Sequence, residues 1–377
     1  MGTKSKYIRV LQFFGDGSIG GKERAIFNLI KSFIDDDTVH IGVAISRGKG
    51  LYCEKIKELK VPIIDVNFNS GFSFNVDLKK IKDMKTYDIH HFHDPSPNLI
   101  LLSLLCGSNV KRVYTRRGGA HDYSKKHFKI KLKYMLNRLL IRHFFDGYSA
   151  NTKHAASYIA DFYKLRHEDI HVLYNGINFN SSFPLIEKQN VFDVLNLDKD
   201  DFVIGTACHL ISIKRVDLII RSFSRCQIKN KKLIILGKGN EMDNLTKLVY
   251  RLGIKNRVIF MGEVENPSDY MQAMDCFILA SGKEESFGNA VVESMLLKIP
   301  TIVMDDSSGL KEHVIDMNTG FIAKDEKDLE ATIEYIYNNK EIALEIAKSG
   351  SEYVSNKYTI NNMVRNYKRF YEQVVKQ

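Results

Sequence analysis

Cysteine and proline are both scarce in this sequence of 377 residues. It contains five cysteines and six prolines, and no two cysteines form a C-x-x-C pair. An odd number of scattered cysteines argues against a disulfide framework, so we expect reduced thiols in a cytosolic protein. Charged residues make up 27% of the chain and hydrophobic residues 44%, a composition that argues against wholesale disorder.

Long apolar runs are also missing. Segment 1–18 holds only a short apolar run before glycine and charge return, which predicts a first strand and not a signal peptide. The most apolar stretch, Asn98 to Gly107, is too short to span a bilayer. A chain of 377 residues exceeds one typical core and suits two domains.

Acidic residues are nearly absent between Lys111 and His143. This segment carries eleven lysines and arginines against one acid, Asp122. The excess of ten equals the net charge of the whole chain, +10. Such a patch predicts an anionic partner, which is a membrane surface, a phosphorylated substrate or a nucleic acid.

Most of these cations lie on a long amphipathic helix predicted over 123–145. Its apolar stripe has helical spacing and consists of Phe128, Leu132, Met135, Leu136, Leu139 and Leu140. The cations lie largely off the stripe and are Lys125, Lys126, Lys129, Lys133 and Arg142. Two interpretations remain open: the stripe packs on the sheet of the first domain, or the helix lies in the interface of an anionic membrane.

The chain alternates between apolar strands and amphipathic helices, which predicts two α/β domains with parallel sheets. The first domain is predicted over 1–180 and the second over 195–357. The predicted strands are 7–14, 39–45, 87–92, 112–115, 147–150, 170–174, 202–208, 232–236, 257–261, 276–280 and 300–304. A polar stretch at 175–201 reads as a linker. The last helix, within 358–377, carries apolar residues on one side and is expected to pack back on the first domain.

Two glycine-rich turns each follow a strand and precede a helix. Gly15, Gly17 and Gly20 match G-x-G-x-x-G, which is typical of a phosphate site at a helix N-terminus. No acid ends the second strand to hold a ribose, so NAD is disfavoured. Gly237 and Gly239 form the second turn. For both turns, tight packing without a ligand is the competing interpretation.

The segment Glu285-Ser-Phe-Gly-Asn-Ala-Val-Val-Glu293 is the most informative stretch. We expect a helix to begin near Phe287–Gly288, so that free backbone N–H groups face a diphosphate. Two carboxylates eight residues apart are expected on roughly one helical side, where both would face a nucleotide sugar. The alternative, a solvated pair of glutamates, is disfavoured because the neighbouring apolar residues make this helix largely buried.

Basic side chains follow other predicted strands. His209 and Lys214 come after the first strand of the second half, where they would neutralise a leaving diphosphate; a surface cation is the alternative for Lys214. His91 and His93 share one face of a strand end. We rank general-base catalysis or sugar binding above a metal there, because no further ligand is nearby. Asp305 and Asp306 are interpreted as neighbouring acids in a loop and not as a metal site.

The second half of the chain, from Phe202 to Phe321, resembles the family-4 retaining glycosyltransferases of the GT-B fold. The run from Arg257 to Ile322 is close to that family's pattern, including its E-x(7)-E motif. In the first half, GGKER at Gly20–Arg24, DIHHFHDP at 88–95 and LYNGIN at Leu173–Asn178 resemble the family's glycine loop, H-x-H segment and interdomain connection.

The resemblance implies an α/β fold of two Rossmann-like domains with a metal-independent active site between them. It implies that Glu285 contacts the donor sugar, that Glu293 holds the ribose, and that His209 and Lys214 bind the diphosphate. The other implied donor-binding residues are Gly20, Gly21, Gly237, Gly239, Val264, Ser286, Phe287, Gly288, Asn289 and Ala290.

Two positions depart from the family. His209 stands where the family has an arginine, and a histidine cannot replace the permanent charge and paired N–H donors of a guanidinium group. Arg117 stands where much of the family has a histidine. With Glu285 and Lys214, we expect His93 and Arg117 to act in catalysis.

The predicted function is transfer of a sugar, with retention, from a nucleotide diphosphate donor to an acceptor hydroxyl, with no cofactor. A UDP-sugar is the favoured donor. A surface-glycan, lipopolysaccharide or lipid-linked acceptor is expected, with Lys125, Lys126, Lys129 and Lys133 at a membrane. The alternatives are a nucleotide-sugar 2-epimerase of the same fold and a basic nucleic-acid-binding protein. The latter is disfavoured because the patch lacks a stacking series of aromatic residues.

Overall fold

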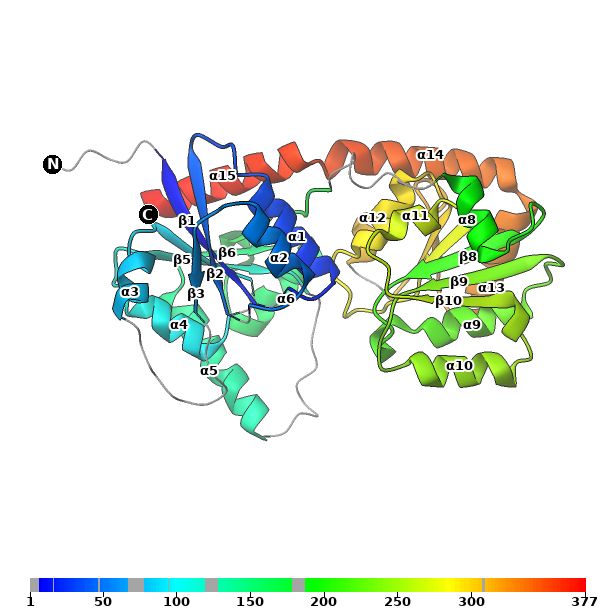
Figure 1. Ribbon diagram of the computed structural model, residues 1–377, viewed down its shortest axis with the longest axis horizontal. Helices are drawn as coiled ribbons and strands as arrows, with labels where there is room; N and C mark the ends of the chain where they lie inside the picture. Colours follow the sequence, from blue (N-terminus) through cyan, green and yellow to red (C-terminus); the bar gives the residue numbers. More distant parts are fainter. Residues whose placement is uncertain are drawn as a thin grey trace. The chain divides into compact units, whose positions relative to one another are not determined.

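A computed structural model describes residues 7–15, 17–46, 48–66, 78–93, 95–118, 128–177, 187–306 and 309–377. The chain forms two compact units, unit 1 (Met1–Ile177 with Ile360–Gln377) and unit 2 (Asn178–Thr359). In each unit a parallel sheet runs between layers of helices (Figure 1). Both units are therefore Rossmann-like α/β folds.

The sheet of unit 1 has seven strands in the order β3-β2-β1-β4-β5-β6-β7. Their bounds are β1 Ile8–Phe14, β2 Val39–Ile45, β3 Ile63–Asp65, β4 Ile89–Phe92, β5 Lys111–Arg116, β6 Gly147–Ala150 and β7 Ile170–Val172. The central strands are almost continuously buried, as expected for a parallel sheet covered on both faces. Gln12 and His91 are register partners in β1 and β4 and are both fully buried.

Among the residues of unit 1 that the structure describes, seven helices cover this sheet. They are α1 Gly21–Lys31, α2 Leu51–Glu58, α3 Leu78–Met84, α4 Pro97–Leu104, α5 Phe128–Phe144, α6 Lys153–Tyr163 and α15 Ile360–Lys376. One buried cluster joins the sheet to α3, α4, α5 and α6, and another joins it to α1, α2 and α15. The hydroxyl of Thr152 caps α6 by accepting from Ala155 N at 3.1 Å. Unit 1 is thus a three-layer fold whose third layer includes α15.

The sheet of unit 2 has six strands in the order β10-β9-β8-β11-β12-β13. Their bounds are β8 Phe202–Ala207, β9 Lys231–Leu236, β10 Val258–Gly262, β11 Cys276–Leu279, β12 Thr301–Met304 and β13 Phe321–Ala323. The helices are α8 Lys188–Leu195, α9 Val216–Arg225, α10 Met242–Arg251, α11 Pro267–Met271, α12 Asn289–Leu296, α13 Glu326–Asn338 and α14 Lys340–Lys357. In the described part of the chain, no helix is both long and apolar enough to cross a membrane.

Three elements differ from the sequence-based expectation. The short strands β3 and β13 were not predicted, because three residues are too few for a periodic signal. The stretch expected to be a linker contains α8, whose buried Val191 and Leu195 lie four residues apart on one side. The helix expected over 123–145 is described as α5 from Phe128 to Phe144, and its expected start lies among residues 119–127, outside the described ranges.

Candidate functional site

In each unit, the predicted site residues follow strands at the carboxyl edge of the sheet. In unit 2, the chain reverses direction along the sheet between β8 and β11, and in unit 1 between β1 and β4. Loops after neighbouring strands meet at such a switch point, which is where open α/β sheets bind ligands. Lys214 and Glu285 lie beyond β8 and β11, while Gly20 and His93 lie beyond β1 and β4.

Lys214 and Glu285 form an ion pair at the edge of the unit 2 sheet. The side chains are 16% and 15% exposed. Burial by itself lowers the Lys214 pKa, but the Glu285 carboxylate raises it, and the net shift is upward. Lys214 is therefore a permanent cation held beside a carboxylate in a position that is still partly open to ligands.

The loop carrying Glu285 leads directly into α12. Gly288 precedes the helix with φ +60°, and a Cβ on this residue would collide with the Leu310 side chain. The positive φ and the lack of room for a Cβ both favour glycine at this position. The helix therefore begins at Asn289 with its first N–H groups at the carboxyl edge of the sheet, where the dipole favours an anion.

The expectation for the two glutamates required both of them to lie on one helix, but α12 begins only at Asn289. Glu285 lies three residues before Gly288 and is not helical, so the expectation of two carboxylates on one helical side is wrong. The left-handed turn at Gly288 is the physical reason. Glu293 is in α12 and only 3% exposed, so it is part of the packed helix.

The second glycine turn packs against the loop after β8. Cβ atoms on Gly237 and Gly239 would collide with the carbonyl oxygens of Cys208 and Leu210. Leu210 N donates to Lys238 O at 2.9 Å, which fixes this close approach. Packing alone thus accounts for both glycines. Figure 1 shows β8, β9 and β10 side by side, as the strand order requires.

Two predicted donor-binding residues frame this turn. His209 follows β8 and is exposed, at the position expected for diphosphate binding. Val264 follows β10 and is partly buried. Between them, Lys238 pairs with Glu263. This edge of unit 2 therefore combines exposed basic groups with a preformed ion pair.

The first glycine turn, in unit 1, is also held by packing. Gly17 N donates to Lys49 O, and Tyr52 N donates to Gly17 O, both at 2.9 Å. Gly20 caps α1, and the carboxylate of Glu23 folds against it. Since Glu23 is an anion already placed in the first turn, Gly20 and Gly21 are a less favourable phosphate site than the start of α12.

His93 and Arg117 meet in a buried network of unit 1. Arg117 Nε donates to His93 Nδ1 at 3.1 Å, and His93 Nε2 lies 2.9 Å from the Gln12 amide oxygen. Because arginine only donates, His93 Nδ1 must accept and Nε2 must carry the proton. Arg117 also donates to Asn175 Oδ1 at 2.6 Å and to Tyr367 OH at 3.0 Å.

The same network continues to His91. Gln12 Nε2 donates to the Tyr371 hydroxyl oxygen at 3.0 Å. The hydrogen of that hydroxyl is then available to donate to His91 Nδ1, which lies 2.8 Å from the Tyr371 oxygen. His91 Nε2 then donates to Thr115 Oγ1 at 2.6 Å. Burial holds the pKa values of His91 and His93 well below the ordinary histidine range. Both imidazoles are therefore neutral, with each ring nitrogen already engaged.

Sequence reasoning missed five members of this network, which are Gln12, Thr115, Asn175, Tyr367 and Tyr371. The available signal was the two tyrosines on the apolar side of the last helix, since a buried tyrosine hydroxyl needs a partner. No metal cluster occurs among the described residues. Asp305 pairs with Lys311 and Asp306 with Arg215, each at 2.8 Å.

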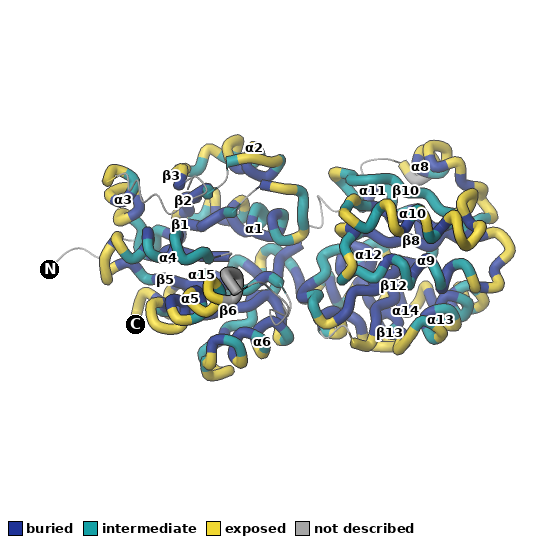
Figure 2. The backbone as a smooth tube through the Cα atoms, turned by 90° about the horizontal axis from the view of Figure 1, so that it is seen from below, coloured by how far each residue is buried: buried dark blue, intermediate teal, exposed yellow. Residues whose placement is uncertain are grey.

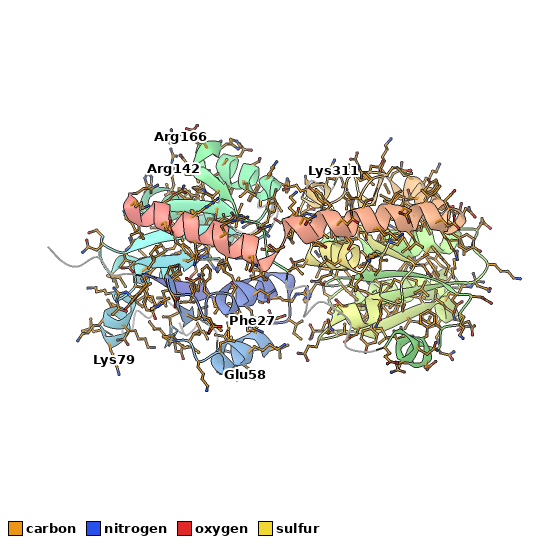
Figure 3. The ribbon with its side chains drawn as sticks, turned by 90° about the horizontal axis from the view of Figure 1, so that it is seen from above. Phe27, Glu58, Lys79, Arg142, Arg166 and Lys311 are labelled. Carbon is orange, nitrogen blue, oxygen red and sulfur yellow. The ribbon has the colours of Figure 1, made fainter. Side chains whose placement is uncertain are left out.

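The basic helix α5 exposes most of its predicted apolar stripe. Leu132, Met135, Leu136 and Leu139 are 40–55% exposed, whereas Leu140 is 8% exposed and packs in the core. Figure 2 colours α5 largely as exposed. Lys133 is exposed, and so is Arg142, which Figure 3 labels at the surface of unit 1. Lys125 and Lys126 lie outside the described residues, as do the side chains of Phe128 and Lys129.

Two protein-family models match consecutive parts of the chain. The model "Glycosyltransferase Family 4" matches residues 19–181, and "Glycosyl transferases group 1" matches residues 187–353. The O-antigen biosynthesis glycosyltransferase WclY of Escherichia coli is 25% identical over 317 residues, covering 80% of this chain and 85% of that protein.

Two further similarities extend the comparison. An N-acetylgalactosaminyltransferase of Campylobacter jejuni, named for a diphospho-undecaprenol acceptor, is 26% identical over 231 residues, covering 60% of each chain. The crystal structure of Anabaena Alr3699/HepE with UDP and glucose has a TM-score of 0.82 at 19% identity, and it covers 97% of this chain and 100% of that one.

Proposed function

This chain is a glycosyltransferase with the GT-B fold, and we propose that it transfers a sugar with retention from a UDP-sugar to a hydroxyl of a surface-glycan or lipid-linked acceptor. The observation that carries the proposal is the Lys214–Glu285 ion pair beside the N-terminus of α12. The relative named for O-antigen synthesis and the relative named for a lipid-linked acceptor support the acceptor class.

The proposed chemistry is mainly electrostatic. Cleavage of the bond between sugar and diphosphate leaves negative charge on the phosphate oxygens. Lys214, the first N–H groups of α12 and His209 are the groups of unit 2 suited to stabilise that charge. On the same face of the sugar, the acceptor oxygen forms a bond to the anomeric carbon and its proton passes to the departing phosphate oxygen. Bond formation on the face that the phosphate leaves gives retention. No protein general base and no metal is needed in this scheme.

Glu285 is proposed to turn from Lys214 to the donor sugar when the diphosphate binds. In the Lys214–Glu285 ion pair, each charge neutralises the other. An incoming diphosphate supplies a second anion for Lys214, which frees carboxylate oxygens of Glu285 to accept from sugar hydroxyls. Glu293, buried in α12, is proposed to hold the ribose.

His93 is proposed to position Arg117 and not to remove a proton. Its Nδ1 already accepts from Arg117 and its Nε2 donates to Gln12, so neither nitrogen is available as a base. Arg117 keeps N–H groups beyond its three hydrogen bonds, since a guanidinium has five donors. These donors are proposed to serve the substrate.

Docking of α5 on the cytoplasmic face of an anionic membrane is proposed as the route to a lipid-linked acceptor. The exposed Leu132, Met135, Leu136 and Leu139 supply an apolar surface, and the exposed Lys133 and Arg142 add positive charge. Apolar and cationic groups on one helix are the features of an interfacial helix.

A thermal-unfolding panel tests the proposed donor. The purified protein is heated alone and with UDP-, GDP- and ADP-sugars. A ligand at a hundredfold excess over its dissociation constant adds about 2.7 kcal/mol to the free energy of unfolding. We expect the UDP-sugar series to stabilise most. No stabilisation by any nucleotide sugar contradicts the proposal, and a sugar-nucleotide isomer formed without an acceptor would instead identify a 2-epimerase.

A further inference from the structure

A buried histidine lies directly beneath the loop that leads into α12. His313 follows the 3-10 helix Leu310–Glu312 and is fully buried. Its ring packs edge-on against Phe287 and Tyr358, with ring centroids at 4.6 and 4.9 Å. Phe287 and Tyr358 also contact each other, at 5.1 Å. Three rings thus form a closed cluster under residues 285–288.

The hydrogen bonds of His313 allow only one tautomer. His313 Nε2 lies 2.7 Å from the carbonyl oxygen of Phe287, and Nδ1 lies 2.6 Å from the Tyr358 hydroxyl. A carbonyl oxygen only accepts, so Nε2 must carry the hydrogen and Nδ1 must accept from Tyr358. Burial lowers the His313 pKa to about 3, which keeps this neutral form throughout the physiological range.

The bond to Phe287 sets the orientation of the next peptide group. In a planar trans peptide, the C=O of one residue and the N–H of the following residue point in opposite directions. Because the Phe287 carbonyl points down to His313, the Gly288 N–H points away from the buried cluster. Gly288 is the residue immediately before α12, so this N–H extends the set of donors at the start of the helix.

We infer that His313 is a positioning residue for donor binding, which aims the Gly288 N–H and the start of α12 at the donor diphosphate by holding the Phe287 carbonyl. The inference rests on the proposed function. The Tyr358 hydroxyl donates to Nδ1 and so satisfies the acceptor nitrogen of the tautomer that the Phe287 carbonyl requires. The Lys357 ammonium reinforces the arrangement, because it donates to Glu312 O at 3.2 Å and to Tyr353 OH at 2.6 Å.

The test measures the affinity for UDP by titration calorimetry, together with the melting temperature without ligand. His313→Leu removes the donor to Phe287 O, and we expect the dissociation constant for UDP to rise about tenfold. His313→Gln keeps an amide N–H that can reach the carbonyl, so its affinity should stay within about threefold of wild type. Tyr358→Phe leaves His313 Nδ1 without its donor, which weakens the hold on the ring, and its affinity should fall between the two.

Ser222→Ala is the matched control. Ser222 is a buried residue of unit 2 whose hydroxyl donates to Glu326 O at 3.1 Å, so its loss also removes one buried hydrogen bond. This variant should melt earlier than wild type and bind UDP equally well. In turnover assays, His313→Leu should raise the KM for the donor and leave the KM for the acceptor unchanged, and His313→Gln should leave both near wild type.

The outcomes separate this inference from the proposed function. Wild-type affinity for UDP in both His313→Leu and Tyr358→Phe, with only the melting temperature lowered, makes His313 a purely structural residue and overturns the inference. Should His313→Leu not fold, wild-type affinity in Tyr358→Phe overturns the inference in the same way, and so does affinity lost in His313→Gln, which keeps the donor to the Phe287 carbonyl. Failure of the wild-type protein to bind UDP, GDP or ADP overturns the proposed function itself, and the inference with it.

Discussion

The carboxyl edges of the two sheets carry similar residue types in different states. In unit 1, His91, His93 and Arg117 form hydrogen bonds to neighbours within the unit, and the donor and acceptor of each bond are fixed. In unit 2, Lys214 and Glu285 form a pair that remains partly exposed beside a helix N-terminus. Polar residues after strands thus identify the ligand-binding edge of a sheet, while their hydrogen-bond and ion-pair partners decide whether they are free to act on a ligand.

Removing the charges of the unit 2 pair should have the largest effect. Glu285→Gln and Lys214→Ala are each expected to lower kcat by roughly 10²- to 10³-fold, because the lost group stabilises the transition state. Sugar transfer is measured under donor saturation, and circular dichroism checks the fold. Glu284→Gln, the neighbouring carboxylate, is the control and should retain most activity. Wild-type turnover in Glu285→Gln would sink the assignment.

The second largest effect is expected in membrane binding, which we predict for unit 1 and not for unit 2. Changing Lys125, Lys126, Lys129 and Lys133 together to Ser should weaken co-sedimentation with anionic vesicles about a thousandfold, since each near-surface cation contributes about 1 kcal/mol and every 1.4 kcal/mol is tenfold in affinity. Binding by wild type should rise with anionic lipid and fall with salt.

The control for this experiment comes from unit 2. Ile342 and Leu344 on α14 are as exposed as Leu139 on α5, at 50%, 49% and 49%. Changing Ile342 and Leu344 to Ser should leave vesicle binding unchanged, whereas changing Leu132 and Leu139 to Ser should reduce it. Wild-type protein that stays in the supernatant at low salt means that α5 does not dock on membranes.

Acid should destabilise unit 1 more steeply than unit 2. Burial keeps His90, His91 and His93 neutral in unit 1, lowering the pKa of His90 to about 4, and keeps His313 neutral in unit 2 with a pKa of about 3. A histidine with a lowered folded pKa stabilises the fold above pH 6.5 and loses this contribution as pH falls towards the folded pKa, because the unfolded chain binds the proton first.

The expected loss at pH 5 is about 2 kcal/mol for each such histidine relative to pH 7.5. Three buried histidines against one predict a loss in unit 1 roughly three times that in unit 2. Hydrogen exchange followed by mass spectrometry measures the stability of each unit separately at both pH values. Equal losses in the two units contradict the prediction.

The smallest effect is expected at His93. His93→Gln can still accept from Arg117 Nε and donate to Gln12, so we expect kcat to fall tenfold or less with an unchanged pH profile. A general base contributes 10²- to 10⁴-fold, so a larger loss accompanied by a missing limb of the pH profile would restore His93 as the base. His93→Leu, which breaks both bonds, should mainly lower stability.

The sequence predicted the buried parallel strands well, because an uninterrupted apolar run between turn residues is a strong local signal. Strands β2 and β6 have the predicted bounds, Val39–Ile45 and Gly147–Ala150. The site was harder, because its contacts are not local. Lys214 and Glu285 are 71 residues apart, and Gln12 and Tyr371 are 359 apart. Residue type alone does not reveal that both ring nitrogens of His93 are occupied.

The discontinuity of unit 1 has a consequence for the order of synthesis. On the ribosome, all of unit 2 is made before Ile360–Gln377, which carries α15 and its buried Tyr367 and Tyr371. Until α15 arrives, Gln12 and His91 lack the Tyr371 hydroxyl, and the apolar face shared with α1 is uncovered. Although domains generally fold from the N-terminal end during synthesis, the nascent unit 1 must wait for unit 2. A premature stop before Ile360 would therefore leave a complete unit 2 joined to a unit 1 without a finished core.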